Sequence, residues 1–131
     1  MEGLEDLERG VLDKLLAGEH PVLAALREQA QRGRLLSRER TGVGFYCSFE
    51  VPREVPIVEP RNFEIDDVNG ELQGLAHGAG FVLFVRDGRL DTLEGFSYDE
   101  PWPPVVNEFK LTYQREPREL KLPDPSGVSP S

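Results

Sequence analysis

Three groups of carboxylates are the side chains in this sequence best suited to chemistry. They occupy residues 64–71, 87–94 and 99–100. Paired carboxylates can transfer protons or bind divalent cations, and glycoside hydrolysis needs two of them facing each other across a cleft. The spacing indicates no such pair, and segment 64–71 lacks the bidentate glutamate of a calcium-binding loop. The groups therefore predict either solvated strand faces and loops or an acidic binding surface.

The other reactive side chains occur singly. His77 precedes Gly78 and Gly80, and these glycines lead into a strand, not into the helix that a dinucleotide-binding motif requires. No second histidine and no cysteine cluster accompanies His77, so we expect neither a metal nor another cofactor. Cys47 is the only cysteine, which fits a reducing compartment. We expect it to be an inert buried thiol and assign no catalytic residue.

The most specific candidate is an aromatic loop near the end of the strand-rich region. Tyr98 and Trp102 enclose Asp99, Glu100 and Pro101, and two more prolines follow. An aromatic residue on a proline-braced loop with neighbouring carboxylates is typical of an interface anchor with a polar rim. The alternative is that Trp102 folds back to cap the core.

The charge of the chain restricts the class of partner. Its 131 residues include 15 Lys and Arg against 24 Asp and Glu, a formal charge of −9. Such a chain repels nucleic acids and anionic membranes, whereas it attracts basic proteins. The sequence shows no signal peptide and no apolar stretch of membrane-spanning length. We therefore expect a cytoplasmic protein that binds a basic protein, with no nucleic acid and no membrane as partner.

Two helices must precede the strands that position these groups. Apolar residues recur at helical spacing over residues 4–17, carboxylates occupy the first turns, and Gly18 ends the pattern. Pro21 suits the first position of a second helix, which Gly33 ends. We expect these helices to form a hairpin that covers one face of a sheet.

Short strands account for most of the remaining chain. Residues 35–40 predict the first strand, and residues 63–68 predict another that Asn69-Gly70 ends. Residues 52–61 hold three prolines and predict an extended connector. The clearest alternation places one set of apolar side chains toward the core: Val43, Phe45, Cys47, Phe49 and Val51.

A hairpin then organises the second half. The apolar run 81–85 and residues 89–98 flank Asp87-Gly88, a favoured pair for a type I′ turn. Residues 109–113 predict a last, edge strand. From residue 115 onward the charged, Pro- and Ser-rich chain predicts a disordered tail.

These elements predict an α+β fold, because no helix separates the strands as a parallel crossover would require. We expect an N-terminal helical hairpin packed on a largely antiparallel sheet of five or six strands. A single domain would occupy residues 1–114, and the disordered tail residues 115–131.

Several segments resemble a group of small uncharacterised bacterial proteins. They are residues 41–46 (TGVGFY), 78–84 (GAGFVLF), 93–98 (LEGFSY) and 102–103 (WP). This group resembles single-domain immunity proteins of toxin–antitoxin or contact-inhibition systems. The motifs are turn glycines and strand apolar residues, so the resemblance implies a protein-binding role and carries over no catalytic residue.

We therefore predict a non-enzymatic acidic binding protein, in particular an immunity protein that neutralises a basic toxin by electrostatic occlusion. One alternative is a small hydrolase or small-molecule-binding domain that uses carboxylates and His77. Another is an assembly domain that forms a homodimer through a sheet edge. The predicted binding residues are Asp66, Asp67, Glu71, Asp91, Glu94, Tyr98, Asp99, Glu100 and Trp102.

Overall fold

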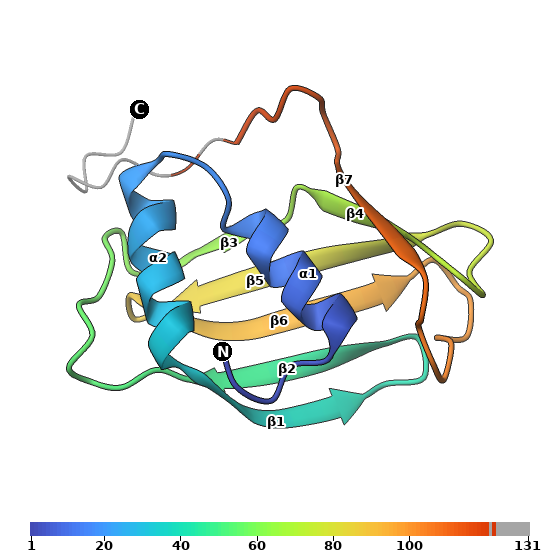
Figure 1. Ribbon diagram of the computed structural model, residues 1–131, viewed down its shortest axis with the longest axis horizontal. Helices are drawn as coiled ribbons and strands as arrows, with labels where there is room; N and C mark the ends of the chain where they lie inside the picture. The colour runs from blue at the N-terminus through green and yellow to red at the C-terminus, as the bar shows by residue number, and fades with distance from the viewer. Residues whose placement is uncertain (121, 123–131) are drawn as a thin grey trace.

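A computed structural model shows two helices packed on one face of a seven-stranded sheet (Figure 1). The structure describes residues 1–120 and 122, so residues 121 and 123–131 of the predicted tail lie outside the described residues. The named strands pair antiparallel throughout the described chain. The predicted α+β class is confirmed, and the sheet has more strands than the five or six expected.

The first helix, α1, spans Asp6–Leu15, inside the predicted range of 4–17. At its start the N–H of Glu5 donates to Glu8 Oε1 at 2.8 Å, which pairs an N–H that no turn of the helix can reach. At its end Arg118 donates to the carbonyl oxygens of Leu15 and Ala17, at 2.8 and 2.7 Å. A guanidinium is favourable there because the helix dipole is negative at its C-terminus.

The second helix, α2, spans Pro21–Arg32 and begins at the proline as predicted. His20 Nδ1 accepts a hydrogen bond from the N–H of Val22 at 3.1 Å, so His20 caps this helix. Further along, the buried side chain of Gln29 crosses to the sheet. Its amide donates to Gly88 O at 2.9 Å and accepts from the N–H of Leu90 at 3.0 Å. These two hydrogen bonds are buried, which makes each costly to lose.

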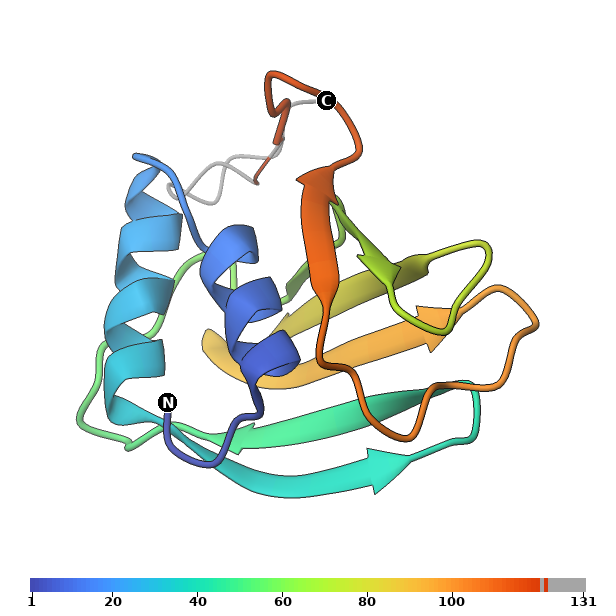
Figure 2. The same ribbon diagram turned by 45° about the vertical axis from the view of Figure 1, so that its right-hand side comes forward.

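The sheet has the order β1-β2-β6-β5-β4-β7, with β3 pairing β5 beside β4. Figure 2 shows that the sheet curves, so that β7 rises beside α1 while β1 lies at the opposite edge. Asp87 and Gly88 join β5 to β6 with φ angles of 52° and 78°, which confirms the predicted hairpin. The strands are β1 Arg34–Arg40, β2 Gly44–Glu50, β3 Phe63–Ile65, β4 Val68–Leu72, β5 Ala79–Arg86, β6 Arg89–Ser97 and β7 Phe109–Tyr113.

The prediction that Asn69-Gly70 ends a strand is wrong. Both residues lie inside β4, where Gly70 pairs with Ala79 of β5. A Cβ atom on Gly70 would lie 2.9 Å from Leu72 Cδ1 and 3.0 Å from Phe81 Cε2. The glycine is therefore needed for close packing and not for a turn. The strand is interrupted earlier, at residues 66–67, which divides the predicted strand 63–68 between β3 and β4.

The alternation predicted for residues 43–51 is confirmed from Phe45 to Val51, whose apolar members are buried. Val43 is the exception and is 47% exposed, because it precedes β2 in the loop from β1. The predicted tail also begins too early. Arg118, four residues into it, donates to Asp67 Oδ2 at 2.6 Å and lies over the Tyr113 ring at 4.5 Å.

Candidate functional site: the open face of the sheet

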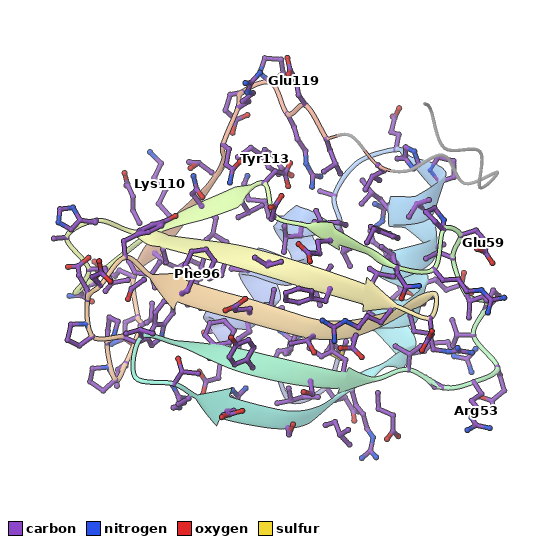
Figure 3. All side chains as sticks on the ribbon, turned by 180° about the vertical axis from the view of Figure 1, so that it is seen from behind. Arg53, Glu59, Phe96, Lys110, Tyr113 and Glu119 are labelled. Carbon is purple, nitrogen blue, oxygen red and sulfur yellow. The ribbon has the colours of Figure 1, made fainter. Side chains whose placement is uncertain are left out.

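The candidate site is the face of the sheet that the helices leave uncovered. Figure 3 looks onto this face, with the helices behind the strands and Phe96 near the end of the central strand β6. Side chains alternate between faces along each strand, so the cross-strand register assigns each residue to a side. We call this side the open face. It carries Ser37, Glu39, Tyr46, Ser48, Glu64, Asn69, Glu71, Val82, Phe84, Thr92, Glu94, Phe96, Lys110 and Thr112.

An apolar strip runs across the middle of the open face. Tyr46 is 38% exposed and Tyr98 50% exposed, while Val82, Phe84 and Phe96 are half-buried. These residues come from β2, β5, β6 and the chain just after β6. Soluble proteins rarely leave neighbouring aromatic side chains uncovered on a sheet, and such patches mark interaction sites.

Phe96 is held in place by its neighbours. A Cβ atom on Gly80 would lie 2.5 Å from Phe96 Cζ, so the ring lies directly across the glycine backbone of β5. Tyr98 packs against the same ring edge-to-face, with centroids 5.7 Å apart and planes at 84°. A ring fixed in this way loses little conformational entropy when a partner covers it.

Carboxylates border the apolar strip, and one of them, Glu94, lies within it between Tyr46 and Val82. Asp91 lies beside Thr92, whose hydroxyl donates to it at 2.8 Å, and Arg86 Nη1 is 3.9 Å from the same carboxylate. The charges of Arg86 and Asp91 therefore cancel. The remaining glutamates outnumber the lysine on the described part of this face, which gives it a negative potential. These glutamates are Glu39, Glu64, Glu71 and Glu94, and the lysine is Lys110, whereas Glu50 on the same face is paired with Arg34.

Glu94 also acts on its cross-strand neighbour. Tyr46 lies opposite Glu94 in the β2–β6 ladder. The Glu94 carboxylate raises the pKa of the Tyr46 phenol, because it accepts the phenol hydrogen bond and adds negative charge nearby. Tyr46 therefore remains protonated and presents a polar tip on an apolar body, which is common in protein interfaces.

The structure brings four of the nine predicted binding residues together on the open face: Glu71, Asp91, Glu94 and Tyr98. Two others lie in the short link between β3 and β4. Asp66 is exposed there. Asp67 is occupied by Arg118, whose Nε is 2.6 Å from Oδ2, so it helps to hold the C-terminal segment.

The last three predicted residues follow Tyr98 and serve different roles. Asp99 is exposed and has a positive φ of 62°. Glu100 accepts hydrogen bonds from the backbone N–H groups of Ala76 and His77, at 2.8 and 2.9 Å. Those bonds lower the pKa of Glu100, and they make it the anchor of the loop before β5.

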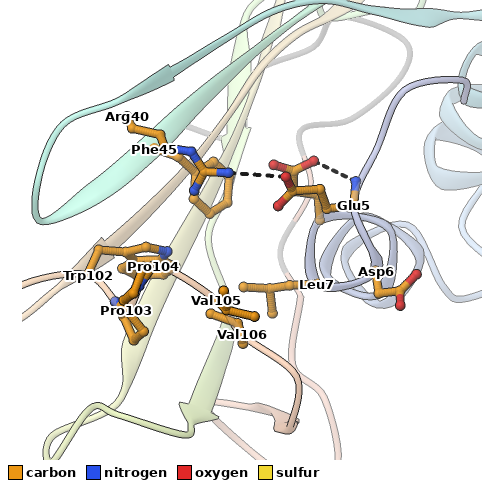
Figure 4. Close-up of a pocket in the computed structure, with 11 residues that line it drawn as sticks. Glu5, Asp6, Leu7, Arg40, Phe45, Trp102, Pro103, Pro104, Val105 and Val106 are labelled. Carbon is orange, nitrogen blue, oxygen red and sulfur yellow. Dashed lines mark hydrogen bonds and ion pairs between the residues drawn. The ribbon is translucent and has the colours of Figure 1, made fainter.

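Trp102 lies on the helix side, where its ring packs edge-to-face on Phe45 with centroids 5.6 Å apart. It forms one wall of a cleft of about 410 Å³ beside the start of α1 (Figure 4). Arg40 and Glu5 also line the cleft and form an ion pair at 3.1 Å. This arrangement matches the alternative in which Trp102 caps the core, and it separates Trp102 from the open face.

A shallow cleft of about 560 Å³ lies beside His77 at the end of β4 and β5. Its wall includes Glu71, Tyr98 and Thr112. The hydrolase alternative calls for a carboxyl with a raised pKa next to His77. The carboxyl bound to the His77 N–H is Glu100, and its pKa is shifted downward.

Cys47 is fully buried beneath α1, next to an ion pair. Burial and the neighbouring Glu8 carboxylate raise the pKa of its thiol to about 12. Arg38 holds Glu8 with Nε at 2.7 Å from Oε2. Burial would raise the pKa of Glu8, but the hydrogen bonds from Arg38 and the Glu5 N–H outweigh it and leave that pKa lowered. The raised pKa and the burial both disfavour the thiolate, which is the form that a nucleophilic cysteine needs.

Sequence reasoning missed several residues of the open face, although part of the signal was present. The alternation over residues 43–51 already places Tyr46 opposite the core. The apolar run 81–85 hides Val82 and Phe84, because a run without polar residues does not show which side is covered. Glu39 and Glu64 join the site only through strand pairing that the sequence does not show, whereas Phe96 lies two residues after Glu94 on the predicted hairpin.

Within residues 1–120 and 122, no three His, Cys, Asp or Glu side chains gather closely enough to hold a metal ion. Neither described helix is long and apolar enough to cross a membrane. Comparison of the chain with protein-family models, with curated proteins and with solved structures found no match.

Proposed function

We propose that this protein is a non-enzymatic binding protein that captures a basic partner protein on the open face of its sheet. The observation that carries the proposal is the group of partly exposed aromatic residues interspersed with carboxylates on a face that the helices leave open. Aromatic anchors within a charged rim are the usual composition of an energetically productive interface. The formal charge of −9 on the whole chain acts in the same direction.

The two parts of the surface have different tasks. The carboxylates accelerate encounter with a cationic partner, and salt screens that effect over about 8 Å at physiological ionic strength. The aromatic residues supply the buried area that keeps the complex together. Binding should therefore weaken with salt mainly through slower association.

We further propose that the partner is a basic toxin and that this chain is its cytoplasmic immunity protein. Two features support this step: the negative charge, and the resemblance of residues 41–46, 78–84 and 93–98 to small bacterial proteins of that type. An immunity protein needs no chemistry of its own, because occlusion of a cationic site is sufficient.

The test is a capture experiment with matched charge variants. The tagged chain is incubated with a lysate of its source organism at low and moderate salt, and bound proteins are identified. The double variant Glu39→Lys, Glu94→Lys alters the open face, whereas Glu28→Lys alters an exposed position on α2. Circular dichroism confirms that the variants are folded.

We expect wild type and Glu28→Lys to capture the same basic protein at low salt. The double variant should fail to capture it, and moderate salt should release it. The purified protein should then bind the chain directly with the same ranking. Equal recovery by all three chains would move the interface off the open face. No basic protein recovered by wild type at either salt concentration would contradict the proposed function.

A further inference from the structure

One row of side chains on the open face has a regular alternation of charge. Glu39 pairs with Tyr46, Tyr46 pairs with Glu94, and Glu94 pairs with Val82. These four residues belong to four neighbouring strands, β1, β2, β6 and β5. The row therefore reads acidic, aromatic, acidic and apolar in a line across the strands. We call it the alternating row.

The spacing of this row is close to that of a helix. Neighbouring strands lie about 4.8 Å apart, so Glu39 and Glu94 are separated by about 9.6 Å with Tyr46 midway. Seven residues of an α-helix span about 10.5 Å, and a residue three or four positions along lies halfway on the same face. A helix with basic residues seven apart and an apolar residue between them would match the row.

The width of the open face also suits a helix. Phe96 lies two residues from Glu94 on one side, and Phe84 lies two residues from Val82 on the other. The rows that hold these rings are separated by about 13 Å along the strands, at about 3.3 Å per residue. An α-helix with its side chains is about 10–12 Å across. The two rings would therefore flank a helix lying on the alternating row.

An extended partner segment would bind less well beside the alternating row than a helix would bind on it. A strand added to a sheet binds along an edge, where backbone groups are free. At the β1 edge the N–H of Leu35 already donates to Glu2 O at 2.9 Å, and Glu2 forms a bridge with Arg34. The next residue, Leu36, forms a bulge, which disfavours further pairing. A helix pairs its own backbone and needs only side-chain contacts.

We propose that the alternating row is the docking track for a basic amphipathic helix of the partner, laid across the strands. The inference rests on the proposed function and specifies its partner. Cations seven residues apart would pair with Glu39 and Glu94, and the apolar residue between them would cover Tyr46. The Tyr46 hydroxyl, which donates to Glu94, can still accept a hydrogen bond from the partner.

Two synthetic helical peptides of identical composition test this geometry. The matched peptide repeats Lys every seven residues with Leu midway, whereas the control peptide spaces its lysines five apart and so places them on different faces. Circular dichroism establishes equal helicity. Fluorescence anisotropy at low salt then measures binding to wild type, to Glu39→Gln, Glu94→Gln, and to the α2 control Glu28→Gln.

We expect the matched peptide to bind wild type and Glu28→Gln about tenfold more tightly than the control peptide, from two additional charge pairs. The double variant should abolish that advantage. Equal binding of both peptides, weakened alike by the double variant, would overturn the helix register and leave the proposed function standing. Binding that the double variant does not weaken, or no binding of either peptide, would also overturn the docking track.

Discussion

The two faces of the sheet differ in whether their polar side chains are buried and paired or exposed to solvent. Leu93 and Glu94 are adjacent on β6, yet Leu93 is fully buried under the helices while Glu94 points to the open face. On the covered face the buried polar side chains of Glu8 and Gln29 are hydrogen-bonded to other groups of the chain. On the open face aromatic rings and carboxylates lie side by side without cover.

This difference indicates a division of tasks. Pairing on the covered face removes the large penalty of burying polar groups, so that face determines stability. The aromatic rings and carboxylates of the open face remain available to contact another molecule. Substitutions on the two faces should therefore separate stability from binding.

The largest expected effect comes from breaking the buried ion pair. Arg38→Ala leaves the Glu8 carboxylate, whose side chain is 4% exposed, without its partner. We expect a loss of roughly 3 kcal/mol in the free energy of unfolding, at the low end for a buried pair because Arg38 is 21% exposed. Urea denaturation measures it.

Arg34→Ala is the matched control for that substitution. Arg34 lies on β1 like Arg38 and pairs with Glu50 of β2, but these side chains are 58% and 53% exposed. Water already solvates both charges, so we expect a loss below about 1 kcal/mol. Equal losses for the two variants would show that burial does not distinguish the pairs.

The pH dependence of stability gives an intermediate effect. Because the folded pKa of Glu8 is below its ordinary value of 4.5, its ionised form stabilises the fold fully above that pH. The contribution is lost as the pH falls through the folded pKa. We expect wild type to exceed Glu8→Gln in stability by a constant amount from pH 7 to about 5, and by less at lower pH. Denaturation series across this range measure the gap, and a gap that widens on acidification would contradict the assignment.

The smallest effect on stability is expected from the open face. Glu39→Gln and Glu94→Gln remove charges that no described ion pair uses. The double variant should change the free energy of unfolding by about 0.5 kcal/mol or less. Thermal and urea unfolding test this, and a loss comparable to that of Arg38→Ala would show that these residues support the fold.

The elements that the sequence predicts correctly are those whose ends are determined by local residues. Pro21, Gly33 and Asp87-Gly88 have backbone preferences that define the second helix and the hairpin. Gly70 shows the limit of such signals, because its role depends on Phe81, which only the folded sheet brings near it.

Long-range pairing was the part that could not be predicted. Glu8 and Arg38 are 30 residues apart, and Asp67 and Arg118 are 51 apart. No local pattern marks such partners. The open face was predictable only in part. Alternation along the strand places Tyr46 on the correct face, but the residues beside it depend on β6 lying between β2 and β5, which no local pattern shows.

Methyl and aromatic NMR of the chain with the matched basic helical peptide tests the central claim most directly. Val82 and Leu83 are adjacent on β5 but lie on opposite faces. If the open face binds basic helices, signals of Val82, Tyr46 and Phe96 should shift strongly while those of Leu83 stay nearly unchanged. Shifts confined to the helices or to the cleft beside Trp102, with Val82 and Phe96 unmoved, would contradict the account.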